Sequence, residues 1–586
     1  MEKTYKQLQA RCVELRLHPC AGKGITKAYL KERIRIAEGM PAITNDFSSS
    51  SSTEEDDENK MVFIEDPPIP LNESKIYEPS YPLPLRDLSF YGAKERKLGS
   101  GAYGEVYLYK SPNESYAVKK MEGGMDSSLL REISILVRCS HENIVEIIDV
   151  VDKGSAFSII MPLAHGDLWS SIMYRELDKN QKLSVTYQLL SALSYLHERS
   201  IIHRDIKPGN VLIFKEDNRV IAKLADFGLS MTYGCNVPTG MTNPMYTLAY
   251  RAPEIIEDQN YSEKADIWAL GVTLFELHYG LGYLFWNRGA HSPYEILVLI
   301  RDTINQKNHI KMLKSQGIEE GIIGLIDEML SLNPERRPDA INLVANSIFD
   351  SIRSEEEVER IECPGKLLLR TAYPIVKNLF PCLYIALEWL YSVTRSLHLK
   401  IRAFHHAIWI YDAVSSSLEI QESAIQMYLS ASLDLAALYA GEDDYSDELV
   451  DYSAKSFTLE QLKEAEINII RTIKYDMVQI LPWDHLSVKK SQLSYIGGEQ
   501  AEFALVILLI TDLRFKMNPR DLAQLAIDIA RYGEEKTDLT PFLKENIENV
   551  RKAMAIADKR AWIPVKAKVS RLTSLFKETP SIQPPL

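Results

Sequence analysis

The stretch that decides the fold is a short loop in which polar, charged and apolar residues follow one another, His203-Arg204-Asp205-Ile206-Lys207-Pro208-Gly209-Asn210. Sixteen residues after Asn210, beyond a hydrophobic hairpin, the chain reads Asp226-Phe227-Gly228. One loop thus carries a carboxylate, an ammonium group and an amide, and a second carboxylate follows it. Carboxylate and amide oxygens are the hard ligands that magnesium prefers. Transfer of a phosphoryl group from a nucleotide requires such a set of groups.

Each of these side chains has an expected role in phosphoryl transfer. Asp205 would accept the proton of a substrate hydroxyl, and Lys207 would stabilise charge on the moving phosphoryl group. Asn210 and Asp226 would hold Mg²⁺, which neutralises charge on the phosphates of ATP. The two motifs resemble the signature of the protein kinase family, and Lys207 resembles its serine/threonine branch. Each motif alone has an ordinary structural explanation, but their joint order and spacing favour the kinase interpretation.

Length and composition describe an ordinary globular protein of several domains. The 586 residues are too many for a single core, so we expect about three or four domains. A net charge of −14 argues against binding of nucleic acid along the whole chain. The 6 cysteines have neither metal-ligand nor redox spacing, which predicts a reducing compartment. The N-terminus lacks the apolar core of a signal peptide, and the longest apolar run, 503–510, is too short to span a membrane. We therefore expect an intracellular protein of the cytoplasm or nucleus, without membrane contact.

The first eighty-odd residues predict a small helical unit and a linker. Two helices with apolar residues at helical spacing are expected within residues 5–38, on either side of Gly22-Lys23-Gly24. This basic helix pair, residues 1–40, resembles a SAP motif, which implies DNA as a partner; a hairpin with a solvated charged face is the alternative. The serine run 48–52, the acidic run 54–58 and six prolines predict a disordered linker over residues 41–87.

The glycine-rich run Leu98-Gly99-Ser100-Gly101-Ala102-Tyr103-Gly104-Glu105-Val106 predicts a hairpin over the phosphates, because glycines let backbone amides approach the oxygens. Lys119 in Tyr116-Ala117-Val118-Lys119 would reach the phosphates, with Lys120 as the competing register. Glu132, on a helix expected over 129–136, is the partner that the family implies for Lys119. The family resemblance assigns ATP binding to Leu98, Gly99, Gly101, Gly104, Val106, Ala117, Lys119, Glu132, Met161 and Ala164.

The run Arg131-Glu132-Ile133-Ser134 resembles the regulatory helix of cyclin-dependent kinases. Alignment on Thr247-Leu248-Ala249-Tyr250-Arg251, just before Ala252-Pro253-Glu254, puts Thr242 at the activating phosphorylation site, where Arg131 and Arg204 would hold the phosphate. A third arginine, usual in the family, is replaced by Met231, and Tyr103 occupies the inhibitory tyrosine position. The family further implies that the helix at 266–271 anchors the catalytic loop and that Arg337 pairs with Glu254.

Prolines nearly vanish after residue 366, and helical periodicity dominates to residue 568. Thr458 and Gln461 predict a capping box at the start of one helix. Residues 366–486 resemble the cyclin box, with Glu466 at the interface glutamate and Leu438 where the paired lysine is usual. Residues 487–568 resemble a degenerate second cyclin repeat, and 569–586 form a tail. A generic helical bundle is the alternative.

The expected fold is α+β, with a bilobal protein kinase at 88–350 followed by an all-α cyclin-like bundle. We expect an ATP- and Mg²⁺-dependent serine/threonine kinase that acts on protein substrates and is activated by an intramolecular contact with its cyclin-like segment. One alternative is a non-catalytic adaptor that binds DNA and sequesters a separate kinase; another is an active kinase whose cyclin-like segment recruits substrates. A kinase–cyclin fusion resembles the gene content of a large DNA virus, whose product would act in an infected host cell.

Overall fold

The computed structural model describes residues 83–101, 104–122, 124–153, 156–216, 219–230, 248–257, 262–282, 284, 293–353, 382–479, 481–490, 493–535 and 540–559. Several sequence predictions therefore lie outside the described residues: the helix pair within 5–38, the linker up to residue 82, Tyr103, Met231, Thr242 and the tail 569–586.

The first lobe is built on a five-stranded antiparallel sheet with the strand order β1-β2-β3-β5-β4. Its strands are β1 (Ala93–Gly101), β2 (Gly104–Lys110), β3 (Ser115–Glu122), β4 (Asp149–Lys153) and β5 (Ala156–Pro162). Valine, isoleucine and tyrosine recur in β2, β3 and β5, and these residue types favour a pleated, half-buried surface. Helix α3 (Ser127–Leu136) begins where Asp126 accepts a hydrogen bond from Leu129 N. This α-helix lies between β3 and β4 in the sequence.

A short segment before β1 is bound to the edge of this sheet. The buried carboxylate of Asp149 on β4 accepts hydrogen bonds from the backbone N–H groups of Leu85 and Arg86 and from the hydroxyl of Tyr91. Tyr91 ends the 3-10 helix η1 (Leu88–Tyr91) and packs edge to face on Tyr116. Residues 83–87 were expected to belong to the disordered linker. They are ordered instead, because a buried carboxylate requires donors and the chain before β1 supplies them.

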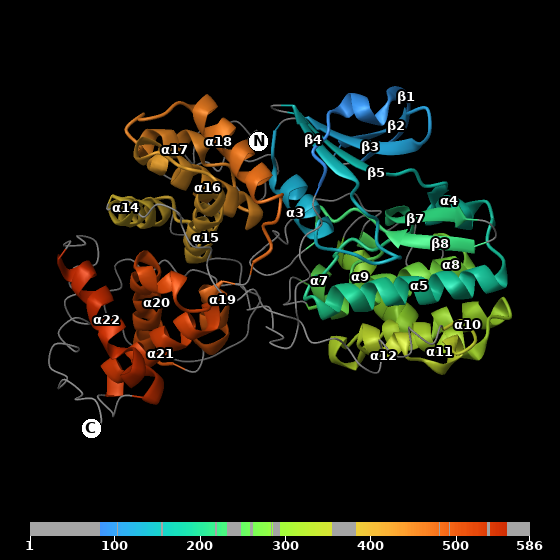
Figure 1. Cartoon of the computed structure of the whole chain (residues 1–586). Helices are drawn as coiled ribbons and strands as arrows, with labels where there is room; N and C mark the ends of the chain where they lie inside the picture. Colours follow the sequence, from blue (N-terminus) through green and yellow to red (C-terminus); the bar gives the residue numbers. More distant parts are fainter. Residues whose placement is uncertain are drawn as a thin grey trace, which may run out of the picture. The chain divides into compact units, whose positions relative to one another are not determined.

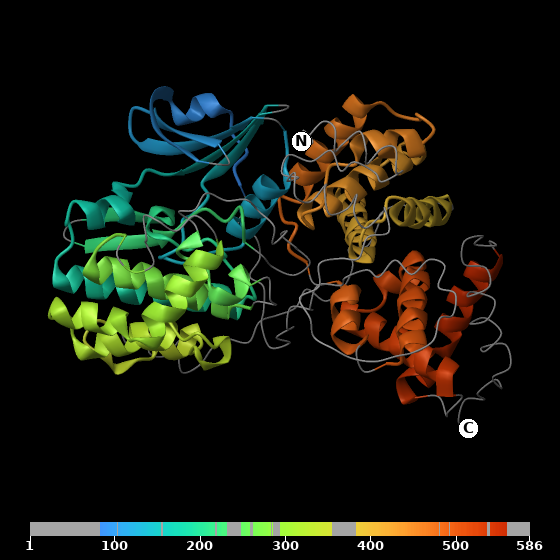
Figure 2. The same ribbon diagram turned by 180° about the vertical axis from the view of Figure 1, so that it is seen from behind.

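The second lobe is mainly helical. A three-stranded sheet, β6 (Gly166–Asp167), β7 (Val211–Glu216) and β8 (Arg219–Leu224), lies near its start. The helices are α4 (Leu168–Met173), α5 (Lys179–Glu198), α7 (Pro253–Ile256), α8 (Lys264–Tyr279), α9 (Pro293–Asn305), α10 (Asn308–Ser315), α11 (Glu320–Met329) and α12 (Ala340–Val344), with the 3-10 helices η2 (Pro208–Asn210), η3 (Pro334–Arg336) and η4 (Ser347–Phe349). Helix α8 is buried along most of its length, which suits its largely apolar sequence. Figures 1 and 2 show the sheet lobe and the helical lobe of residues 83–353 from opposite sides.

The remaining described chain is entirely helical. Its first helices are α14 (Leu383–Ser396), α15 (Ile401–Ser417), η5 (Glu422–Ala424), α16 (Ile425–Tyr439), α17 (Ser446–Tyr452) and α18 (Leu459–Thr472). The others are α19 (Pro482–Lys490), α20 (Tyr495–Ile510), η6 (Asp512–Phe515), α21 (Pro519–Glu535) and α22 (Pro541–Lys559). Helix α16, rich in alanine and leucine, packs against α14, α15, α17 and α18. The capping box predicted at Thr458 and Gln461 is confirmed, and so is the α+β fold class with a helical part after the kinase-like lobes.

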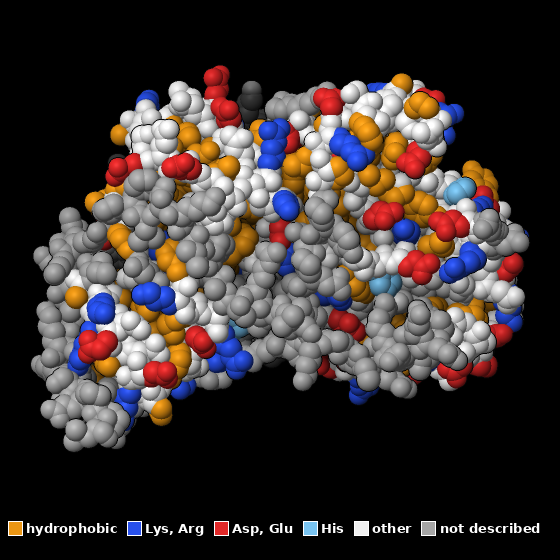
Figure 3. Space-filling model, viewed as in Figure 1, with side chains coloured by type: hydrophobic (Ala, Val, Ile, Leu, Met, Phe, Trp, Pro, Cys, Tyr) orange, Lys and Arg blue, Asp and Glu red, His pale blue; other side chains and the backbone are white. Residues whose placement is uncertain are grey.

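The described surface carries charges of both signs. On the face drawn in Figure 3, acidic and basic side chains of the described residues are interspersed. Among the described helices, none is both long enough and apolar enough to cross a membrane.

Candidate active site

One buried carboxylate near the start of α8 anchors the loop at 203–210. Asp266 accepts hydrogen bonds from the backbone N–H groups of His203, at 2.7 Å, and Arg204, at 2.8 Å. Burial alone would raise the pKa of Asp266, but these bonds and the neighbouring His197 lower it below its ordinary value. Arg204 has a φ of 68°, a conformation that costs free energy for a residue with a side chain, and its bond to Asp266 helps to hold it. The loop is therefore a fixed platform.

Three of the expected site residues meet on this platform. Asp205 Oδ2 accepts a hydrogen bond from Lys207 Nζ at 2.6 Å and one from Asn210 Nδ2 at 2.9 Å. Asn210 Nδ2 also donates to the backbone oxygen of Asp205 at 2.8 Å. Both bonds to the carboxylate use Oδ2, so Oδ1 of Asp205 makes no side-chain hydrogen bond with the described residues. The arrangement orients the carboxylate and leaves one of its oxygens available.

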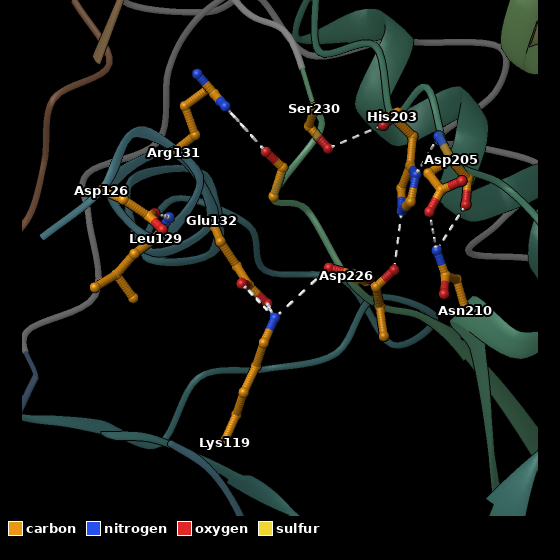
Figure 4. A network of polar contacts seen from close by, with 12 residues as sticks. Lys119, Asp126, Leu129, Arg131, Glu132, His203, Asp205, Asn210, Asp226 and Ser230 are labelled. Atoms are coloured by element: carbon orange, nitrogen blue, oxygen red, sulfur yellow. Dashed lines mark hydrogen bonds and ion pairs between the residues drawn. The ribbon is translucent and has the colours of Figure 1, made fainter. Parts of the chain in front are cut away.

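A second group joins the sheet lobe to the chain after β8. Lys119 Nζ on β3 donates to both carboxylate oxygens of Glu132 on α3, at 2.9 and 2.6 Å, and lies 3.6 Å from Asp226 Oδ1 (Figure 4). Burial of Lys119 opposes its charge, but the two facing carboxylates outweigh this and raise the pKa of its ammonium group. Lys120 points elsewhere, over the ring of Tyr109. The register of β3 therefore directs Lys119, and not Lys120, toward Glu132 and Asp226.

The oxygens around Asp226 fit a magnesium ion. Asp226 has a φ of 64°, and its Oδ1 is buried without a hydrogen-bond donor. Asn210 uses its Nδ2 for hydrogen bonds, which leaves its amide oxygen available. The described residues contain no cluster of three or more His, Cys, Asp or Glu side chains placed around a metal. Two protein oxygens suit Mg²⁺, which usually keeps water and substrate phosphates as its other ligands.

The glycine-rich run forms the end of the β1–β2 hairpin. Gly101 pairs with Gly104, and Gly99 pairs with Val106. Gly104 has a φ of 143°, and a Cβ there would lie 2.4 Å from the backbone oxygen of Lys120, so a larger residue does not fit. A Cβ at Gly99 would meet no atom within 4 Å, which leaves open space beside that backbone.

The residues expected around the adenine lie on neighbouring strands. Ala117 on β3 is paired with Met161 on β5, and both are buried. Val106 is half-buried, and Leu98 is 37% exposed at the mouth of the hairpin. Ala164 follows β5 and is half-buried. The structure thus gathers this group on β1, β2, β3 and the end of β5.

The expected regulatory residues are placed differently. Arg131 is buried, and its N–H groups meet the backbone oxygen of Gly228 rather than an acidic side chain. Arg204 is half-buried on the 203–210 loop, while Tyr103 and Thr242 lie outside the described residues. Arg337 pairs with Glu254 through two bonds of 2.6 and 2.9 Å, as the sequence indicated.

Glu466, expected at the interface, lies within a polar cluster of the helical part. It accepts a hydrogen bond from Lys463 Nζ at 3.2 Å, and Lys463 also reaches Asp434 and Asp444. The cation beside Glu466 is therefore Lys463, on the same helix α18, whereas Leu438 carries no charge. Burial and the neighbouring Asp434 raise the pKa of Glu466 well above its ordinary value.

Sequence reasoning missed the contacts that join α3 and β4 to the helical part. Arg138 donates to both carboxylate oxygens of Asp476 at 2.5 and 2.8 Å, in a buried position. Asp152 on β4 accepts hydrogen bonds from Arg471 and from the hydroxyl of Tyr475. No periodicity or motif marks these residues, and more than 300 positions separate the partners, so only the charges themselves could have hinted at them.

Comparison with known proteins places two families along the chain. Residues 93–349 match the model of the protein kinase domain, and residues 349–478 match that of the cyclin N-terminal domain. Serine/threonine-protein kinase crk1 of Schizosaccharomyces pombe is 32% identical over 291 residues, which are 44% of this chain and 84% of that protein. Cell division control protein 2 homolog 2 of Trypanosoma brucei brucei is 30% identical over 310 residues, covering 48% of this chain and 89% of that protein.

Proposed function

The chain belongs to the protein kinase family, and from this premise we propose that it is a serine/threonine kinase activated by its own cyclin-like segment. It would transfer the γ-phosphate of ATP to hydroxyl groups of protein substrates. The observation that carries the proposal is the contact of Lys119 with the buried Glu132 on one side and with Asp226 on the other. In protein kinases the lysine–glutamate ion pair and the metal-binding aspartate must be in place together.

The residues of the two groups divide the chemistry between them. Mg·ATP, when bound, supplies the phosphoryl group and a cation that neutralises the phosphate charges. Asn210 and Asp226 would hold the metal through their available oxygens, and Lys119 would hold the phosphates. Asp205 would orient the substrate hydroxyl and take its proton on Oδ1, because Oδ2 is already occupied by Lys207 and Asn210. Lys207 would stabilise negative charge that develops beside Asp205.

Activation by the helical part is supported first by the burial of α3. Nine consecutive residues of this helix, 128–136, are buried, although the helix has distinct polar and apolar faces. Residues of α16 contact α3. Glu132 and Lys119 therefore form their ion pair at a helix that is enclosed on all sides. Such packing favours the inward position of α3, in which Glu132 meets Lys119.

Activation is supported next by the corner that follows α18. Lys474 and Tyr475 have φ values of 56° and 61°, a conformation that costs free energy for residues with side chains. The corner presents Tyr475 to Asp152 on β4 and Asp476 to Arg138 just after α3. We infer that the strained backbone conformation persists because it lets the corner bind both β4, through Asp152, and the residue Arg138 that follows α3. A covalent tether between the two parts raises their effective concentration to the order of millimolar for a short linker.

The kinase activity is tested by incubating the full chain with Mg·ATP and a peptide library that offers serine, threonine and tyrosine. Phosphorylation of serine or threonine peptides is expected, and it should disappear in an Asp205→Asn variant. Transfer equal in the two proteins, or none in either, would contradict the proposal; the second result would favour a non-catalytic adaptor.

Activation in cis has its own test. Deleting residues 366–586 should lower kcat/KM sharply, because α3 would lose the packing that holds Glu132 inward. Unchanged kcat/KM for a peptide without docking sequences would instead favour recruitment of substrates by the helical part.

A further inference from the structure

Arg131 is a buried cation without an acidic partner among the described residues. Its side chain is 2% exposed, and its Nε and Nη2 both donate to the backbone oxygen of Gly228, at 3.4 and 3.3 Å. Nη2 also contacts Ser127 Oγ at 3.4 Å, and Nη1 is buried without a hydrogen-bond partner. A buried guanidinium is costly unless it is hydrogen-bonded, so the Gly228 carbonyl is the main acceptor that compensates for its burial.

Gly228 lies directly against the first turn of α3. A Cβ at this position would come within 2.3 Å of Ser128 Oγ, which is closer than any real contact allows. The absence of a side chain at residue 228 therefore permits this close approach to Ser128. Helix α3 and the Asp226-Phe227-Gly228 turn are therefore in close contact through the side chains of Ser128 and Arg131.

Two adjacent residues of α3 thus reach both ends of one turn. Glu132 binds Lys119, which faces Asp226 at the start of the turn, and Arg131 binds Gly228 at its end. Figure 4 shows that the side chains of Arg131 and Glu132 extend from the same helix in different directions. If α3 moved outward, both links would break together. The position of the helix and the position of Asp226 are therefore coupled.

We propose that Arg131 is a positioning residue that locks the Asp226-Phe227-Gly228 turn onto α3 through the Gly228 carbonyl, so that Asp226 is placed for its metal without a phosphate at Thr242. The inference rests on the proposed function, because Asp226 is taken as the metal ligand. The hydrogen-bond acceptor in this contact is the backbone oxygen of Gly228, which is present whether or not Thr242 carries a phosphate. The loss of the third phosphate-binding arginine, where the chain has Met231, is compatible with such a lock.

The first test is a double-mutant cycle in the full chain with Arg131→Met and Thr242→Ala. Thr242→Ala alone should retain most activity. Arg131→Met should lower kcat/KM for Mg·ATP by about tenfold to a hundredfold, as expected for lost hydrogen bonds to a charged group, and by the same factor in both backgrounds. An Arg131→Met effect confined to the Thr242 background, or loss of activity in Thr242→Ala alone, would overturn the proposal in favour of phosphate binding by Arg131.

A second readout does not need turnover. Hydrogen exchange of the nucleotide-free full chain should become faster in Arg131→Met both in α3 and around residues 226–230, because the two segments would separate. Arg131→Lys should restore part of the protection by donating a single hydrogen bond. Faster exchange in α3 alone, with residues 226–230 unchanged, would show that Arg131 merely stabilises the helix.

The matched control is Ser127→Ala, which removes the other hydrogen-bond partner of Arg131 but leaves Gly228. It should keep the exchange pattern and the Mg²⁺ concentration for half-maximal activity, whereas Arg131→Met should raise that concentration. An equal effect of the two variants would contradict the assignment to Gly228. Absence of kinase activity in the unmodified chain would refute the proposed function, while the exchange experiment would still decide whether Arg131 holds the turn.

Discussion

Arg138 and Asp476 form a buried, two-bond ion pair although they lie 338 positions apart in the sequence. Arg138 follows α3, and Asp476 follows α18, so the pair connects the sheet lobe to the helical part. Both side chains are at most 7% exposed, which removes each charge from water. Removing one partner of such a pair leaves an uncompensated buried charge and typically costs about 3–5 kcal/mol.

This ion pair gives the first prediction. Asp476→Arg should place two cations together, lower kcat/KM and weaken protection of α3 in hydrogen exchange. Arg138→Asp should act in the same direction, and the double variant Arg138→Asp/Asp476→Arg should recover part of the activity, because opposite charges meet again. Kinetics of the four proteins measure the coupling; strictly additive losses in the double variant would show that the pair does not link the two parts.

The second prediction concerns Glu254 and Arg337 within the helical lobe, which are 4% and 1% exposed. Arg337→Ala should lower the free energy of unfolding by about 3–5 kcal/mol, because the Glu254 carboxylate would remain buried and unpaired. Urea denaturation followed by fluorescence measures the change. The double variant Arg337→Met/Glu254→Gln, which removes both charges, should lose clearly less. A double variant as unstable as Arg337→Ala would mean that shape, rather than charge, sets the cost.

The third prediction is a loss of stability in acid that originates in α15. Burial and the nearby Arg402 lower the pKa of His405 to about 3, and its neighbour His406 is lowered in the same direction. The unfolded chain takes up a proton below pH 6.5, but the folded chain does not until about pH 3, so stability falls as the pH falls through this window. His405 alone should cost on the order of 2 kcal/mol at pH 5.

The histidine prediction is checked by urea denaturation of the helical part of the full chain at pH 7 and pH 5. A His405→Leu variant, which cannot take up a proton, should lose less stability between these two pH values than the unmodified chain. An equal loss in both proteins would assign the acid sensitivity to other groups.

The fourth prediction has the opposite sign and concerns Glu466. Its pKa is raised by burial and by Asp434, so the folded chain retains a proton that the unfolded chain releases above about pH 4.5. Stability contributed by this group therefore falls as the pH rises above that value. Glu466→Gln, which keeps the shape and cannot ionise, should become the more stable protein as the pH increases. Urea denaturation from pH 5 to pH 9 measures the difference; parallel curves would show that Glu466 is ionised and well compensated.

Much of the fold and of the candidate site followed from local sequence. The loop containing Asp205 and Asn210 brings its side chains together because they lie within a few residues of one another on a short, anchored segment. The capping box at Thr458 is likewise a contact over three positions. Such contacts are encoded by spacing, and spacing can be read directly.

The tertiary structure decided the partners of several other buried charges, for which the sequence offered no guide. Nothing near Arg131 in the sequence distinguishes a phosphate from the Gly228 carbonyl, and nothing near Asp149 indicates that the chain before β1 would supply its donors. Glu466 takes its hydrogen bonds from residues of its own bundle, Lys463 and Ser446. A buried charge takes whichever group folding brings within hydrogen-bond distance, and that depends on the packing of elements distant in the chain.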